Sequence, residues 1–181
     1  MIRIIGGIYK GRFLEIPNSK VTRPTMDKVR QAIFNALYEK VENSICCDLF
    51  AGSGAMGLEA ISRGCKKCYF IDKDHGTFKI LQQNINSLNI EKDKFETYCM
   101  DYRVFIKRNS ELKLDLIFLD PPYRMNINAS IIKDLKERNL LNKHATIVSE
   151  QEPLNEQIEG FVMKEYRYGA KHVAIYTLED D

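Results

Sequence analysis

A glycine-rich segment lies between a predicted strand and a predicted helix, and it reads Asp48-Leu49-Phe50-Ala51-Gly52-Ser53-Gly54-Ala55-Met56-Gly57. Gly52, Gly54 and Gly57 match the GxGxxG pattern, in which glycines permit a tight turn and a close approach of a ligand to the backbone. The N-terminus of the following helix offers unpaired N–H groups to an anion. Asp72 ends the next predicted strand, where a carboxylate can accept hydrogen bonds from both hydroxyls of a ribose. The segment predicts a nucleoside ligand, either NAD-like or S-adenosylmethionine-like.

Two further acidic residues favour the second of these ligands. Asp48 precedes the glycine turn, where a carboxylate would repel a pyrophosphate and would suit the cationic amino group of a methionine moiety. Asp101 follows the third predicted strand, where its carboxylate can accept a hydrogen bond from the adenine amino group. The backbone N–H of Tyr102 can then bond to a ring nitrogen. Together with Asp72, these residues predict a cofactor site along the C-terminal edge of three adjacent strands.

The segment Asp120-Pro121-Pro122-Tyr123 follows the fourth predicted strand. The two prolines forbid helix and stiffen the loop, so their carbonyl groups have fixed directions. A carboxylate and a fixed carbonyl can together accept both hydrogens of an exocyclic amine, and the Tyr123 ring can stack on the base that carries it. The motif predicts binding of an aromatic amine beside the nucleoside site.

A parallel sheet would bring these motifs together. From residue 44 onward, predicted strands alternate with predicted helices, which implies right-handed βαβ units and a sheet covered on both faces. The apolar runs at 45–50 and 114–119 fit strands that are buried on both sides. The fold class is therefore α/β, a doubly wound sandwich whose last two strands form an antiparallel hairpin at the sheet edge. We expect strands over residues 45–50, 67–71, 95–100, 114–119, 145–149, 160–167 and 172–178, and helices over 55–62, 75–88, 102–107 and 129–138.

The first 40 residues have a different pattern. Segments 3–8 and 12–16 predict two short strands of a small hairpin, and Thr25 is the expected cap of a helix that begins at Met26. Val29, Ile33, Ala36 and Leu37 would form the buried face of this helix. Eight basic residues stand against three acidic ones here, which favours a polyanionic partner. We expect one domain over residues 1–181, with a basic extension (1–43) on a catalytic core (44–181).

Composition excludes several classes of protein. The 181 residues are 44% hydrophobic and 29% charged, as in soluble globular proteins, and no apolar run approaches the ~20 residues that span a bilayer. The N-terminus lacks the apolar stretch of a signal peptide, so we expect a cytoplasmic protein. The five cysteines include one lone CxxC pair, and the three histidines are scattered, so we expect reduced thiols and no metal site.

Motifs spread along the chain carry a family resemblance: Arg3–Gly7, Lys10–Arg12, Thr22–Thr25, Lys28–Arg30, Phe34-Asn35, Asp48–Ala60, Asp72–Asp74 and Asp120–Tyr123. In these residues the chain resembles the RsmD-type enzymes, class I S-adenosylmethionine-dependent methyltransferases that methylate the N2 amine of a guanine in 16S ribosomal RNA. The Asp-Pro-Pro-Tyr motif is shared with many amino-methyltransferases, whereas the N-terminal motifs are more specific to this family. The departures are Cys46-Cys47 and Asp72, where a glutamate is common, and either acid can hold a ribose. The resemblance covers nearly the whole chain.

The resemblance implies a Rossmann-like sandwich with a seven-stranded, mostly parallel sheet and an antiparallel last strand. Its cofactor would be S-adenosylmethionine, and its partner would be 16S ribosomal RNA, presented by an assembling small subunit to a monomeric enzyme. The flipped guanine would lie beside Asp120, whose carboxylate would orient the amine together with the Pro121 carbonyl. The implied residues are Asp120, Pro121, Pro122 and Tyr123 for catalysis; Asp48, Phe50, Gly52, Gly54, Asp72, Lys73, Asp101 and Tyr102 for the cofactor; and Lys10, Arg12, Arg23, Thr25, Lys28 and Arg30 for RNA.

Three alternatives stay open at this point. The same chemistry could act on an adenine amine in DNA or on a guanine in another RNA. The glycine turn also fits an NAD-dependent oxidoreductase, although such an enzyme has no use for Asp-Pro-Pro-Tyr. The third alternative is an RNA-binding module without activity, which the intact acids at positions 48, 72, 101 and 120 oppose.

Overall fold

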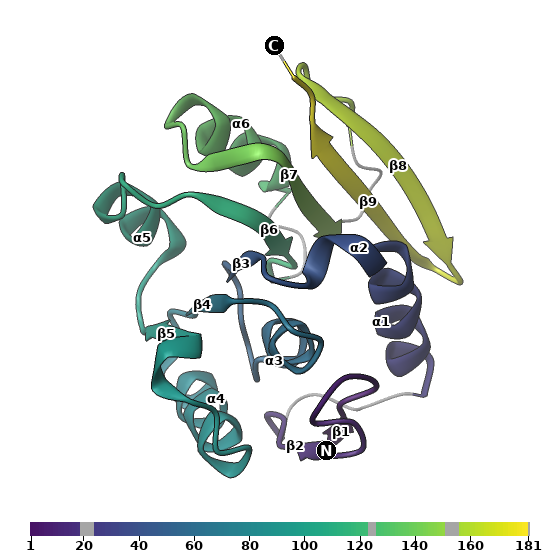
Figure 1. Ribbon diagram of the computed structural model, residues 1–181, viewed down its shortest axis with the longest axis vertical. Coiled ribbons are helices and arrows are strands. Elements are labelled where there is room, and N and C mark those ends of the chain that lie inside the picture. Colours follow the sequence, from purple (N-terminus) through teal and green to yellow (C-terminus); the bar gives the residue numbers. More distant parts are fainter. Residues whose placement is uncertain (19–23, 123–125, 151–155, 181) are drawn as a thin grey trace.

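A seven-stranded sheet forms the centre of the molecule, with helices on both faces (Figure 1). The computed structural model describes residues 1–18, 24–122, 126–150 and 156–180. The strand order is β5-β4-β3-β6-β7-β9-β8; the first five pair in parallel, and β9 is antiparallel to both neighbours. This topology confirms the predicted α/β fold and its antiparallel last strand. The strands are β3 (Ile45–Asp48), β4 (Lys67–Ile71), β5 (Phe95–Tyr98), β6 (Leu114–Leu119), β7 (Leu141–Glu150), β8 (Phe161–Tyr168) and β9 (Lys171–Leu178).

Alternating side chains divide the apolar core into one cluster on each face of the sheet. On one face, Cys46, Phe118 and Val148 pack with helices α1, α3 and α4; on the other face, Cys47 and Ile147 pack with α5 and α6. Burial on both faces confirms the doubly wound arrangement. The helices are α1 (Pro24–Ala36), α2 (Tyr38–Val41), α3 (Ala55–Ser62), α4 (His75–Ser87), α5 (Tyr102–Arg108) and α6 (Asn128–Glu137), with a 3-10 turn, η1, at Lys92–Lys94.

Strand β7 differs most from its prediction. It begins at Leu141 rather than at residue 145, and it extends to Glu150. Its register against β6 shifts between Leu114 and Leu116, and His144 has a positive φ of 57°. This irregularity breaks the apolar alternation, so the first half of the strand could not be predicted from its pattern.

The N-terminal hairpin is shorter than predicted: β1 is Ile2–Arg3 and β2 is Phe13–Leu14. Helix α1 begins at Pro24, so the prediction that Thr25 caps a helix starting at Met26 is wrong. Proline suits a first helical position because its φ is fixed and it lacks the N–H that would be unpaired there. The buried face of the helix also differs, because Phe34 is buried and Ala36 is exposed.

A buried carboxylate, Glu59 of α3, holds the hairpin and α1 in place. Its side chain is fully buried and accepts hydrogen bonds from the backbone N–H groups of Ile5 at 2.9 Å and Gly6 at 3.0 Å. It also pairs with the guanidinium groups of Arg30 at 3.3 Å and Arg63 at 2.8 Å. Two segments distant in sequence are thereby fixed to the helix that follows the glycine turn.

Within the described part of the chain, no helix has both the length and the apolar character needed to cross a membrane. The same residues contain no group of three or more histidine, cysteine or acidic side chains placed to hold a metal ion. All five cysteines are free thiols, and four of them are buried.

Candidate active site

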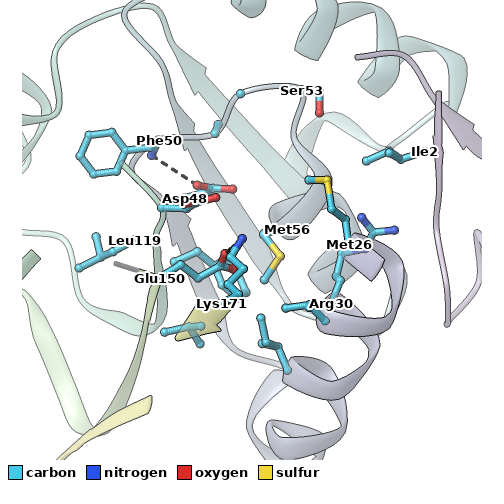
Figure 2. Close-up of a pocket in the computed structure, with 18 of the residues that line it drawn as sticks. Ile2, Met26, Arg30, Asp48, Phe50, Ser53, Met56, Leu119, Glu150 and Lys171 are labelled. Carbon is cyan, nitrogen blue, oxygen red and sulfur yellow. Dashed lines mark hydrogen bonds and ion pairs between the residues drawn. The ribbon is translucent and has the colours of Figure 1, made fainter. Parts of the chain in front are cut away.

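Two pockets meet at the edge of the sheet where β3, β4, β6 and β7 end. The larger is a cleft of about 580 Å³ over the ends of β3, β4 and β6, and the smaller is a pocket of about 150 Å³ beneath α1 (Figure 2). Phe50, Gly52 and Asp120 line both. The larger volume is in the range of pockets for whole small molecules, roughly 300–1,000 Å³, whereas the smaller one suits a single ring system.

The glycine turn shapes the wall of the larger cleft. Gly54 is the N-cap of α3 with a φ of 92°, a left-handed conformation that side chains rarely adopt. At Gly57, a Cβ atom would lie 2.3 Å from the Phe70 ring, so only glycine lets α3 pack this closely on β4. Asp72 fixes the loop from the neighbouring strand, because its carboxylate accepts the backbone N–H of Gly52 at 2.8 Å and of Asp74 at 2.9 Å.

Asp48 lies buried at the end of β3, with 3% of its surface exposed. Burial raises the pKa of its carboxyl to about 8, although the backbone N–H of Phe50, at 3.4 Å, favours the charged form. The negative charges of Asp120, Asp72 and Glu150 raise this pKa as well. Burial therefore favours the protonated form of Asp48, and a cation beside it would favour the charged form.

The far side of the cleft is formed by the residues after β4 and β5. Asp101 is the N-cap of α5, and its carboxylate pairs with the Arg103 guanidinium at 2.9 Å, which lowers the pKa of Asp101. The rings of Phe50 and Tyr102 lie 5.2 Å apart, and the exposed residue Lys73 joins them in the lining. The cleft thus combines aromatic walls with carboxylates at both ends.

The Asp-Pro-Pro segment closes the junction between the pockets. Asp120 is exposed directly after β6, Pro121 is half-buried and Pro122 is exposed. Both prolines line the larger cleft. The fourth residue of this motif, Tyr123, lies outside the described residues, so its predicted stacking role stays a prediction.

The predicted RNA-binding residues separate into two groups. Lys10 and Lys28 are exposed and line a groove of about 570 Å³ between the hairpin and α1, together with Arg3. Arg12 is exposed, and its guanidinium donates to the Ser87 carbonyl at 2.7 Å. Arg23 and the side chain of Thr25 lie outside the described part.

Arg30 does not lie on the surface, contrary to the prediction that it contacts RNA phosphate there. The residue is only 6% exposed, pairs with Glu59 and Asp27, and donates to the Arg3 carbonyl. Its position follows from the helix, because it sits between Val29 and Ile33 on the buried face. Arg30 thus holds the hairpin and helix together and lines the smaller pocket.

Sequence reasoning missed two charged residues of the smaller pocket, Glu150 and Lys171. Glu150 ends β7 and Lys171 begins β9, and their side chains form an ion pair of 2.5 Å. The predicted strands stopped one residue short at both positions. Glu150 stands two residues after the buried Val148, and this period of two is the signal that could have placed its side chain in the pocket.

The fold and the site together are those of a class I methyltransferase. The sheet has seven strands with an antiparallel last strand, a glycine turn follows β3, and carboxylates stand at the ends of successive strands. A family model described as "Conserved hypothetical protein 95" matches residues 2–177. The chain belongs to this family, and two relatives named ribosomal RNA small subunit methyltransferase D confirm the RsmD-type resemblance.

Relatives and solved structures agree with this assignment. The chain is 37% identical over 152 residues to "Ribosomal RNA small subunit methyltransferase D" of Haemophilus influenzae, covering 83% of this chain and 79% of the relative. It is 34% identical over 154 residues to the protein of the same name in Escherichia coli, covering 85% and 76%. The structure of "Putative methyltransferase yhhF" from Escherichia coli superimposes with a TM-score of 0.86 at 29% identity and covers 99% of both chains.

Proposed function

We propose that this protein transfers a methyl group from S-adenosylmethionine to the exocyclic N2 amine of a guanine in small-subunit ribosomal RNA. The observation that carries the proposal is the position of Asp120, a carboxylate that lines both the larger cleft and the smaller pocket. A methyl donor in one and an amine in the other would meet at this residue. The named activity of the relatives, modification of small-subunit ribosomal RNA, supports the choice of RNA.

The donors and acceptors along the larger cleft and at its junction with the smaller pocket fit S-adenosylmethionine. Asp48, which lines the smaller pocket, is a buried acid with a raised pKa, and the cationic amino group of the ligand would offset the cost of ionising it. Asp72 would accept from ribose hydroxyls, and the backbone after Asp101 would face the adenine. The cofactor supplies a sulfonium methyl group when bound.

On the acceptor side, the chain positions a poor nucleophile. The lone pair of a guanine N2 amine is conjugated with the ring, so the amine must be oriented and its developing positive charge stabilised. The Asp120 carboxylate and the fixed Pro121 carbonyl would accept its two hydrogens. Apolar side chains of the smaller pocket, including Met26, Met56 and Phe118, would surround the ring and exclude water.

The basic groove between the hairpin and α1 would hold RNA phosphate. Lys10 and Lys28 lie on its two walls, and α1 also lines the smaller pocket, so a bound backbone would be led toward the base site. We infer that folded RNA in an assembling subunit presents the base to this site. We place this activity in the cytoplasm and assign it to a monomer.

Transfer of labelled methyl to RNA tests the proposal. Unmodified 16S transcript, naked and in reconstituted small subunits, is incubated with labelled S-adenosylmethionine, and the nucleosides are separated. Label in N2-methylguanosine is the expected result. S-adenosylhomocysteine should raise the melting temperature of the protein, and NAD should not. Absence of label in both RNA forms, with cofactor binding demonstrated, would overturn the ribosomal assignment and direct the assay to transfer RNA and DNA.

A further inference from the structure

Two charged side chains face the smaller pocket without a role in the chemistry proposed above. Glu150 is 8% exposed, and its carboxylate lies 2.5 Å from the ammonium group of Lys171. Figure 2 shows this pair pointing into the same pocket as Asp48. We propose that Glu150 and Lys171 read the Watson–Crick edge of the target base and select guanine. This inference rests on the proposed function and names the specificity residues of that site.

The sheet places the relevant side chains in a row. The carboxyl ends of β3, β6 and β7 and the amino end of the antiparallel β9 lie at one edge, and these four strands are consecutive neighbours. At or directly after these ends stand, in strand order, Asp48, Asp120, Glu150 and Lys171. Asp48 pairs with Phe118 and Glu150 with Val173, so the row runs diagonally outward along the edge. Leu119 pairs with Ser149, so Asp120 and Glu150 stand level with each other.

All four residues belong to the same face of the sheet. Each stands two positions from a strand residue whose side chain packs in the core cluster beneath α1 and α3, and side chains two apart along a strand share a face. These strand residues are Cys46, Phe118, Val148 and Val173. The row therefore runs from the cofactor side of the pocket at Asp48 to an ammonium group at Lys171.

This order of groups complements guanine. Along its Watson–Crick edge, guanine presents the N2 amine, then the N1–H donor, then the O6 acceptor. Asp120 would accept from the amine, the Glu150 carboxylate from N1–H, and Lys171 would donate to O6. An ammonium group has three donors, so Lys171 can keep its pair with Glu150 while it binds O6.

The same row opposes adenine. The N1 atom of adenine is an acceptor, and its lone pair would face the buried carboxylate of Glu150. Glu150 would keep its Lys171 partner but would meet a second acceptor where guanine offers a donor, which is unfavourable. At C6, adenine presents an amine to the Lys171 ammonium, so donor meets donor. The pocket thus favours guanine by attraction and excludes adenine by repulsion.

The test uses RNA in which the methylated guanosine, once mapped by the assay above, is replaced by 2-aminopurine. This base keeps the amine but lacks both N1–H and O6. For the wild-type protein, we expect kcat/KM to fall about a hundredfold or more on the 2-aminopurine RNA, since two hydrogen bonds to charged groups are lost. Methyl transfer to each RNA is measured with the full chain.

Two substitutions then assign the selectivity to its residues. Glu150→Gln should lower kcat/KM on guanine RNA about tenfold and reduce the preference for guanine by a similar factor, because an amide can donate to the N1 of 2-aminopurine. Lys171→Met should lower kcat/KM on guanine RNA only, because 2-aminopurine has no O6, and Lys171→Arg should restore most of it. Glu179→Gln, at the exposed far end of β9, is the matched control and should leave both rates unchanged.

Binding of S-adenosylhomocysteine checks the fold of each variant, because neither Glu150 nor Lys171 lines the larger cleft. The inference is overturned if wild type methylates both RNAs equally well, or if the variants lower both rates by the same factor, as a structural role would. If wild type forms no N2-methylguanosine at all, the proposed function fails and this inference fails with it. Lys171→Met is the milder test, since the lysine side chain is 39% exposed.

Discussion

Replacing Asp48 by asparagine should stabilise the ligand-free protein, and the gain should depend on pH. The pKa of Asp48 is raised from 3.8 to about 8, chiefly by burial. Between these values, the unfolded chain has released the proton while the folded protein keeps it, so stability falls as pH rises. At 1.36 kcal/mol per pKa unit, a difference of about 4 units sets an upper limit on the order of 5 kcal/mol, reached above pH 8.

Asparagine removes this loss without changing the shape of the side chain. Its carbonyl oxygen can still accept the N–H of Phe50, which lies 3.4 Å from the aspartate oxygen. Free energies of unfolding in urea are measured for both proteins at several pH values from 4 to 8.5. The difference should be near zero at pH 4 and grow steadily with pH. Asp93→Asn, at an exposed position, is the control and should stay within about 0.5 kcal/mol of wild type.

Ligand binding gives a second measure of the same proton. At pH 6.5 the amino group of S-adenosylhomocysteine is protonated, and its charge should cause Asp48 to ionise. Calorimetry in buffers of different ionisation enthalpy should then report release of about one proton per ligand from wild type and none from Asp48→Asn, which should bind more weakly. Unfolding free energies that run parallel from pH 4 to 8.5 would refute the reasoning about Asp48.

Three further predictions concern Asp120, the buried carboxylate of Glu59, and the basic groove. Asp120→Ala should lower methyl transfer about a hundredfold or more while leaving the affinity for S-adenosylhomocysteine nearly unchanged, measured by labelled transfer and calorimetry. Glu59→Gln should destabilise the protein by about 3 kcal/mol in urea unfolding, because Arg63 loses its charged partner and the buried Arg30 keeps only Asp27. Lys10→Ala with Lys28→Ala should weaken RNA binding and reduce the slope of log affinity against log salt by about 1 per lysine, measured by filter binding.

Each of these has a control and an outcome that contradicts it. Equal loss of transfer and of cofactor binding would remove Asp120 from the reacting centre. Glu42→Gln, at an exposed position, is the control and should leave the free energy of unfolding unchanged. If Glu59→Gln also left it unchanged, the role of Glu59 in holding the hairpin would be contradicted. Lys92→Ala, on η1, should leave the salt slope unchanged, and an unchanged slope for the double variant would place the RNA elsewhere.

Local patterns were sufficient to predict much of the fold. The apolar run at Leu114–Leu119 and the segments Ala55–Ser62 and Lys67–Ile71 have the predicted bounds, because each combines a clear period with a glycine or charged boundary. The glycine turn and the acids after successive strands could be placed at one sheet edge, because parallel strands end on the same side.

Tertiary contacts decided what local patterns could not. Arg30 is basic and near the N-terminus, so composition placed it on the surface, but its partner Glu59 lies 29 residues away on another helix. The insertion of β9 between β7 and β8 has no local signal either. Glu150 and Lys171 meet only because of that insertion. Predicting each strand separately therefore could not pair them.

The inner position of β9 also sets an order of assembly. The hairpin of β8 and β9 closes through a two-residue turn at Gly169 and Ala170, a local contact of the kind that forms rapidly. Until that hairpin docks, β7 presents an open sheet edge to other chains. Before the hairpin docks, β7 lacks its β9 neighbour and Glu150 lacks the Lys171 ammonium group. The exposed edge of β7 makes the interval before the hairpin docks the one most open to aggregation.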